Sequence, residues 1–123
     1  MVALDYFERM EAEGAQLLIG AHGFAEMYSG LTRLPARPPL AEVPGILRAL
    51  REICEVIELS ADDYMEVIQR AARLGLVSGA IYDLLHVRSA EVGGADKLVT
   101  FNGRDFRRME PQGTCQLVVL KGI

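Results

Sequence analysis

Short apolar segments alternate with longer segments of helical periodicity along this chain. Four short segments have the length and apolar character of buried strands: residues 16–20, 55–59, 97–101 and 116–120. Apolar residues recur at three- and four-residue steps in the segments around them, which predicts helices over residues 3–14, 21–34, 44–53, 61–74 and 79–91. The strands are too apolar to leave one face in water. The alternation therefore predicts an α/β fold in which helices flank both faces of a mostly parallel sheet.

The predicted helices carry recognisable end signals. Ser60–Asp63 has the spacing of a capping box, and Gly75 and Gly93–Gly94 are suited to helix C-termini. Ser78 is a candidate cap for the helix that follows it, and the proline-rich residues 35–39 form a loop. The expected buried face of the 61–74 helix consists of Tyr64, Val67, Ile68, Ala71 and Ala72. These elements predict a single domain over residues 1–123.

Composition excludes several classes of protein. A chain of 123 residues has room for one core, and no apolar run approaches the roughly 20 residues that span a bilayer. Acids interrupt the first apolar stretch, which excludes a signal peptide. With 13 basic and 17 acidic residues the net charge is −4, so bulk attraction cannot drive nucleic-acid binding. Two isolated cysteines, Cys54 and Cys115, indicate reduced thiols in a cytoplasmic protein, and His22 and His86 add no recognised spacing for structural zinc.

Polar residues follow the predicted strands at the edge where function is expected. In open parallel sheets, ligands bind in the crevice outside the carboxyl ends of the strands. Glu26 lies in the helix after the first strand, between glycines at helical spacing. Asp83 lies near the start of an otherwise apolar helix, where an unpaired acid is costly. Asn102 and Asp105 follow the third strand.

Carboxylates gathered at one sheet edge repel each other unless a cation lies between them. Mg²⁺ takes oxygen ligands and keeps several waters, which suits phosphate substrates. A metal ion held there lowers the pKa of a bound water and neutralises charge on a phosphodiester. The pattern therefore favours a site for Mg²⁺ or Mn²⁺.

Each of these residues also has a simpler structural interpretation. Glu26 alone is typical of a solvated helix acid, and Asp83 alone would need a partner such as Arg88 or a backbone amide. Asn102 and Asp105 have the spacing of a capping pair. His86 lies three residues after Asp83 on the same helix face, where a packed or exposed histidine is more common than a proton shuttle.

Three segments match the pattern of a known family. They are Leu-Ile-Gly-Ala-His-Gly-Phe-Ala-Glu-Met-Tyr-Ser-Gly-Leu-Thr-Arg-Leu at 18–34, Gly-Leu-Val-Ser-Gly-Ala-Ile-Tyr-Asp-Leu-Leu-His at 75–86, and Gly-Gly-Ala-Asp-Lys-Leu-Val-Thr-Phe-Asn-Gly-Arg-Asp-Phe-Arg-Arg at 93–108. Together they resemble a PIN domain, and most of all the toxin ribonucleases of bacterial VapBC toxin–antitoxin pairs. The resemblance covers essentially the whole chain.

The resemblance implies a set of site residues and a reaction. Glu26 and Asp83 would be metal ligands and catalytic residues. Asn102 or Asp105 would be the further metal ligand, at the family's last polar position, and Asp105 is a third candidate catalytic residue. Thr100 lies near this position. From their chemistry, Arg104, Arg107 and Arg108 could contact phosphates, although charges on a short surface helix usually only face water; the candidate substrate-binding residues are Thr100, Arg104 and Arg107. The implied activity is cleavage of RNA phosphodiester bonds by water, with Mg²⁺ or Mn²⁺ as cofactor. The implied partners are RNA, a cognate antitoxin that inserts an Arg or Lys into the acidic pocket, and a second copy of the chain in a homodimer.

The chain departs from the family pattern at its start. PIN domains ordinarily begin with a central strand that ends in an aspartate, whereas this sequence opens at what matches the following helix. Asp5 falls within the helix pattern and is not assigned to that position. The expectation is therefore a PIN-like domain that lacks its first central strand. Two alternatives follow: a catalytically inactive module for protein binding or dimerisation and, less favoured, an unrelated doubly wound domain of the receiver type.

Overall fold

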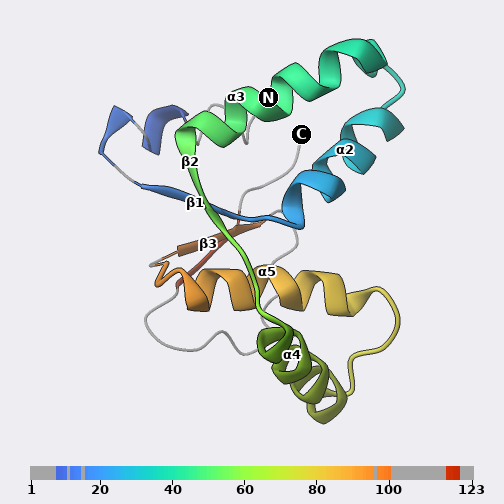
Figure 1. Cartoon of the computed structure of the whole chain (residues 1–123), viewed down its shortest axis with the longest axis vertical. Coiled ribbons are helices and arrows are strands. Elements are labelled where there is room, and N and C mark those ends of the chain that lie inside the picture. Colours follow the sequence, from blue (N-terminus) through green and yellow to red (C-terminus); the bar gives the residue numbers. More distant parts are fainter. Residues whose placement is uncertain (1–7, 11, 15, 96, 101–115, 120–123) are drawn as a thin grey trace.

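The structure is a computed structural model that describes residues 8–10, 12–14, 16–95, 97–100 and 116–119, the last two ranges as backbone only. The helices and strands alternate as predicted (Figure 1). Their bounds are β1 Leu17–Gly20, α2 Gly23–Arg33, a 3₁₀ turn Leu40–Glu42, α3 Val43–Ile53, β2 Cys54–Ile57, α4 Ala61–Leu74, α5 Ala80–Val92, β3 Lys97–Thr100 and β4 Gln116–Val119. Residues 8–10 and 12 are helical, within the predicted 3–14 helix.

The strands form two parallel pairs. Leu17–Gly20 of β1 pairs with Cys54–Ile57 of β2, and Lys97–Thr100 of β3 pairs with Gln116–Val119 of β4. The predicted parallel arrangement is confirmed, but within the described residues no pairing joins β1–β2 to β3–β4 into one sheet. The segment before residue 8, on which the expectation of a missing first strand rests, lies outside the described residues.

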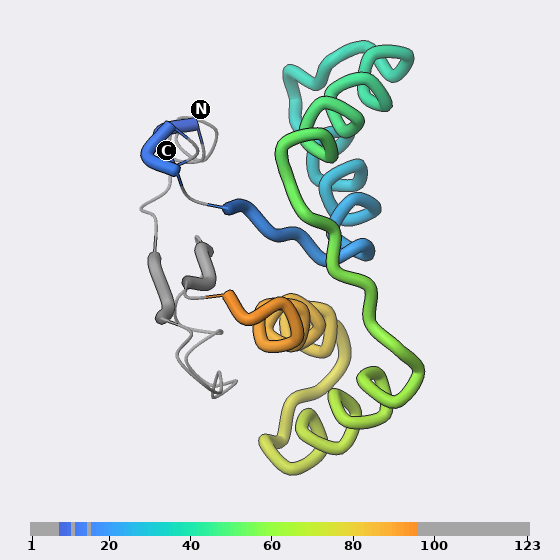
Figure 2. The backbone as a smooth tube through the Cα atoms, turned by 60° about the vertical axis from the view of Figure 1, so that its left-hand side comes forward, coloured from blue at the N-terminus to red at the C-terminus, as the bar shows by residue number. Residues whose placement is uncertain are grey.

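Helices flank the strands from two sides. Figure 1 shows α2 and α3 above β1, with α4 and α5 below it, and Figure 2 shows the same separation from another direction. Helix α5 packs against both β1 and β3, so it is the element shared by the two strand pairs. None of the helices in the described part of the chain has the length and apolar character needed to cross a membrane.

The hydrophobic core lies mainly between α4 and α5. Its buried members are Val67, Ala71, Leu76, Leu84, Leu85 and Val87. The predicted buried face of α4 is wrong in part, because Tyr64 and Ile68 are 39% and 45% exposed and Ala72 is also exposed. The buried stripe instead runs through Val67, Arg70 and Ala71, so that a charged residue occupies a place in the core.

The end signals of α4 are confirmed, and the expected cap of α5 is not. The backbone N–H of Asp63 donates to Ser60 Oγ at 3.1 Å, and the backbone N–H of Ser60 donates to Asp63 Oδ2 at 3.0 Å. Gly75 ends the helix in the left-handed region, at φ +70°. Ser78 does not cap α5: Gly79 holds the N-cap position without a side-chain hydrogen bond, and Ser78 lies at φ +54°, outside the conformation of an N-cap residue.

Candidate metal centre

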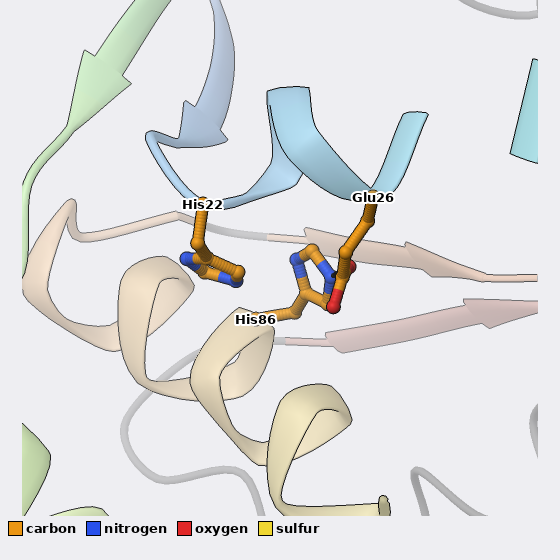
Figure 3. A group of neighbouring side chains, drawn as sticks. All are labelled: His22, Glu26 and His86. Atoms are coloured by element: carbon orange, nitrogen blue, oxygen red, sulfur yellow. Dashed lines mark hydrogen bonds and ion pairs between the residues drawn. The ribbon is translucent and has the colours of Figure 1, made fainter. Parts of the chain in front are cut away.

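Three potential metal ligands converge where α2 begins and α5 passes beneath it. Figure 3 shows His22 and Glu26 descending from α2 and His86 rising from α5 between them. His22 is the N-cap residue of α2, and Glu26 lies four residues later in its first turn, on the same side of the helix. Each side chain offers one ligand atom, and these three atoms all lie within 4.8 Å of one another.

The three side chains also contact one another directly. His86 Nε2 and Glu26 Oε2 are in direct hydrogen-bonding contact. The rings of His22 and His86 lie 4.5 Å apart between centroids, at an interplanar angle of 45°. The Glu26 side chain is 41% exposed and that of His86 27% exposed, so the cluster is open to solvent on the Glu26 side.

His22 contributes a buried ring nitrogen to the cluster. Its Nε2 atom is buried and, among the described residues, has no hydrogen-bond partner. Burial lowers the pKa of His22, the proximity of His86 lowers it further, and Glu26 acts in the opposite direction. The ring is therefore neutral at pH 7, which leaves a nitrogen lone pair to bind an ion or accept a proton.

Two glycines bring these elements into contact. Gly20 is buried at the end of β1, and a Cβ atom there would lie 2.6 Å from Ser89 Oγ and 2.7 Å from His22 Cε1. At Gly23, a Cβ atom would lie 3.2 Å from Ile19 Cγ1 and 3.5 Å from His86 Cε1. Small residues at these positions let α2 and α5 approach the strand, and they set the position of His22 and His86.

Of the predicted site residues, Glu26 lies in this cluster and Asp83 lies beside it. Asp83 is half-buried in the first turn of α5, one helical turn before His86. Residues three apart on a helix are neighbours, so Asp83 and His86 share a face. The partner suggested for Asp83 is engaged elsewhere, because Arg88 pairs with Asp63, Glu66 and Glu91.

The other predicted site residues are not described as side chains. Thr100 is the last residue of β3, where only the backbone is described. Asn102, Arg104, Asp105 and Arg107 lie outside the described residues. Their predicted roles in binding metal and RNA stay predictions.

Sequence reasoning did not select His22 as a candidate ligand, nor the two arginines that line a neighbouring hollow. His22 follows the carboxyl end of the first strand, so the rule that selected Glu26 would also have selected it. Arg48 and Arg51 of α3 line a hollow of about 400 Å³ together with Ala21, Phe24, Pro44, Leu47, Val56 and Glu58. The hollow lies next to the start of α2 and places two cations near the carboxyl ends of β1 and β2.

The family of the chain follows from its sequence match. Residues 2–110 match the family model of the PIN domain. No curated protein and no solved structure matches the chain. PIN domains are generally nucleases that depend on a divalent metal ion, and the family suggests RNA as a ligand. The mixed α/β architecture and the cluster of potential metal ligands agree with this family. Because the match spans most of its length, the chain belongs to the PIN domain family.

Proposed function

We propose that this protein is a metal-dependent endoribonuclease and the VapC-like toxin of a type II toxin–antitoxin pair. The observation that carries the proposal is the contact between Glu26 of α2 and His86 of α5, one helical turn from Asp83. Glu26 and Asp83 are 57 positions apart in the sequence, yet this contact puts their helices together at the carboxyl end of β1. Two acids on helices that meet at this edge would suit a divalent ion, which supports the proposal.

We propose the following roles for the chain's own residues. Glu26 and Asp83 hold Mg²⁺ or Mn²⁺, and the N-terminus of α5 favours the negative charge of Asp83. Asn102 or Asp105 completes the site through water. The bound ion supplies an activated water and neutralises charge on the phosphate.

Local cations bind the RNA, because the net charge of −4 excludes bulk attraction. Thr100, Arg104 and Arg107 contact the RNA backbone. The proposed partners are RNA, a cognate antitoxin and a second copy of the chain in a homodimer, and the proposed location is the cytoplasm. The antitoxin presents an Arg or Lys to the acidic pocket, because a charge-assisted hydrogen bond to a carboxylate is stronger than a neutral one.

The test of the nuclease activity is RNA cleavage by matched variants. Purified protein is incubated with a structured RNA and with Mg²⁺ or Mn²⁺, and cleavage rates are compared for wild type, Asp83→Asn and Asp62→Asn. Asp83→Asn is expected to lose at least about 100-fold in rate, since loss of even an outer-shell group costs 10- to 100-fold in metal sites. Asp62 is exposed in the first turn of α4, so Asp62→Asn is the matched control, and this variant is expected to cleave RNA at the wild-type rate.

Equal cleavage by wild type and Asp83→Asn would contradict the assigned site. No cleavage by the wild-type protein under either metal, with tight binding of a partner protein, would favour the inactive interaction module instead. The toxin role has its own readout. Expression of the wild-type protein in a bacterial host is expected to arrest growth, and expression of Asp83→Asn is expected to allow normal growth. Normal growth of cells that express a wild-type protein with nuclease activity would contradict the toxin role.

A further inference from the structure

We infer that His22, Glu26 and His86 form a binding site for a transition-metal ion of the Co²⁺ or Zn²⁺ type. Two imidazole nitrogens and one carboxylate oxygen would be its protein ligands. The site shares Glu26 with the proposed nuclease centre but requires neither Asp83 nor RNA. It is therefore testable whether or not the chain cleaves RNA.

The geometry of the three ligand atoms is close to that of a bound ion. Zinc–nitrogen and zinc–oxygen bonds are about 2.0–2.2 Å, which puts the ligands of a tetrahedral ion about 3.3–3.5 Å apart. The three ligand atoms here already lie within 4.8 Å of one another. Small side-chain rotations would therefore bring them to bonding distance, and three protein ligands leave a fourth position for water.

Two helices fix the ligands independently of one another. His22 and Glu26 are four residues apart at the start of α2, which puts them on one side of that helix. His86 reaches the same point from the middle of α5, and Figure 3 shows its ring between the other two side chains. Gly20 and Gly23 permit this close approach. The three groups converge because of the packing of β1, α2 and α5.

The buried nitrogen of His22 is the second observation. Buried polar atoms are nearly always hydrogen-bonded, and one without a partner is costly. His22 Nε2 is buried and has no partner among the described residues. A metal ion would satisfy this atom.

The donor set decides which class of ion is bound. Imidazole nitrogens suit Zn²⁺, Co²⁺ and related ions, whereas Mg²⁺ prefers oxygen ligands and gives up its waters reluctantly. The contact between His86 and Glu26 shows that the nitrogen and the oxygen point at each other, and a bound ion would lie between them. We therefore expect Co²⁺ and Zn²⁺ to bind here in the presence of excess Mg²⁺.

The first test uses Co²⁺ as a spectroscopic probe. The full chain is titrated with Co²⁺ in buffer containing millimolar Mg²⁺, and the visible absorption of protein-bound Co²⁺ is followed. Wild type is expected to give saturable bands at one equivalent of Co²⁺. His22→Ala and His86→Ala are each expected to weaken binding at least tenfold, and Glu52→Gln, an exposed acid of α3, to bind like wild type. Circular dichroism establishes that each variant is folded.

Histidine ring signals provide a second, site-specific readout. The sequence contains only two histidines, so both ring resonances can be followed by NMR during a Zn²⁺ titration. Both are expected to shift together and to saturate at one equivalent. Saturation of His86 alone, no saturable binding up to about millimolar metal, or unchanged Co²⁺ binding by the double variant His22→Ala/His86→Ala would overturn the inference.

Asp83→Asn separates this inference from the proposed nuclease. It is expected to bind Co²⁺ like wild type while losing RNA cleavage. Co²⁺ binding by a wild-type protein that cleaves no RNA would leave the site standing and contradict only the proposed function. Mg²⁺-dependent cleavage without histidine-dependent Co²⁺ binding would contradict only the site.

Discussion

Arg70 is a charged side chain in the core between α4 and α5. It is 5% exposed and donates two hydrogen bonds to Glu91 of α5, at 3.0 and 2.8 Å. The two charges cancel in an environment with little water, and the two-pronged geometry satisfies both carboxylate oxygens. An ion pair of this kind fixes how the two helices pack but costs desolvation to form.

Removing one partner of this pair is expected to destabilise the protein strongly. Arg70→Leu leaves Glu91 buried without its main partner, which costs about 3–5 kcal/mol in comparable pairs. A loss of stability at the low end of this range is expected, because Arg88 Nη1 lies 3.5 Å from Glu91 Oε1 and still partly compensates its charge. Urea unfolding measures the change. Arg48→Ala, an exposed arginine of α3, is the control and is expected to stay within about 0.5 kcal/mol of wild type.

The double variant Arg70→Leu/Glu91→Leu distinguishes a buried pair from two independent residues. It is expected to recover much of the lost stability, because no uncompensated charge remains in the core. If the double variant loses as much stability as the two single variants together, the unpaired charge is not the reason for the loss in Arg70→Leu.

The burial of Arg70 and the contact between His22 and His86 mark the limit of what sequence patterns can predict. Periodicity predicts which face of a helix is buried from its apolar residues, and an arginine is then expected to be exposed to solvent. Arg70 became buried only because Glu91, 21 positions away, meets it from another helix. His22 and His86 are 64 positions apart, and only the packing of α2 on α5 brings their rings together. Glu26 could be selected as a candidate from the sequence because its place after a strand is a local signal.

Helix α4 shows how far local signals reach. Its capping box and its terminal Gly75 were predicted from the sequence, because each depends on residues within one helical turn. Its buried face was predicted only in part, since which side is covered depends on α5. The bounds of β2 also differ from the prediction. The strand begins at Cys54, one residue earlier than predicted, and ends at Ile57, two residues earlier.

The capping box makes the stability of α4 dependent on pH. The backbone N–H of Ser60 is the main cause that lowers the pKa of Asp63 below its usual 3.8, followed by hydrogen bonds from Arg88 and from the Ser60 hydroxyl. A carboxyl with a lowered pKa in the folded state stabilises the protein above its unfolded pKa. That contribution is lost as the pH falls through the lowered value.

Asp63→Asn is therefore expected to be less stable than wild type at pH 7, with a gap that narrows as the pH falls below 3.8. Unfolding in urea across a pH series measures this gap. The neighbouring Asp62→Asn, exposed in the same turn, is the control and is expected to show a much smaller gap at pH 7. A gap for Asp63→Asn that stays constant down to pH 3 would show that the carboxylate charge is not responsible.

Helix α5 connects the parts of the domain. It contacts both strand pairs and carries residues of the core and of the candidate site. The alternation of elements predicted the parallel pairing and the helices on two sides of the strands. It did not predict two separate strand pairs within the described residues, because which strand edges meet depends on contacts distant in sequence. At Gly93, where α5 ends, a Cβ atom would lie 2.9 Å from Leu18 Cδ1 and 3.1 Å from Ile57 Cδ1, so this end is pressed against β1 and β2.

Gly20 lies where β1, α2 and α5 meet, and its substitution tests whether packing of the whole domain positions the histidines. In Gly20→Ala the new methyl group would lie 2.6 Å from Ser89 Oγ and 2.7 Å from His22 Cε1, so both side chains must move. Overpacking of this kind typically costs about 1–3 kcal/mol. We expect lower stability in urea and weaker Co²⁺ binding, because the displaced ring no longer faces Glu26 and His86.

Gly30→Ala is the matched control from the middle of α2. A Cβ atom there meets no atom within 4 Å, so the substitution is expected to stabilise the helix by about 0.5–1 kcal/mol and to leave Co²⁺ binding unchanged. The two variants thus alter the same kind of residue with opposite expected effects on stability. If Gly20→Ala loses stability but binds Co²⁺ as tightly as wild type, then His22 either is not a ligand or is not held in place by this contact. The NMR signal of His22 during Zn²⁺ titration then decides between these two explanations.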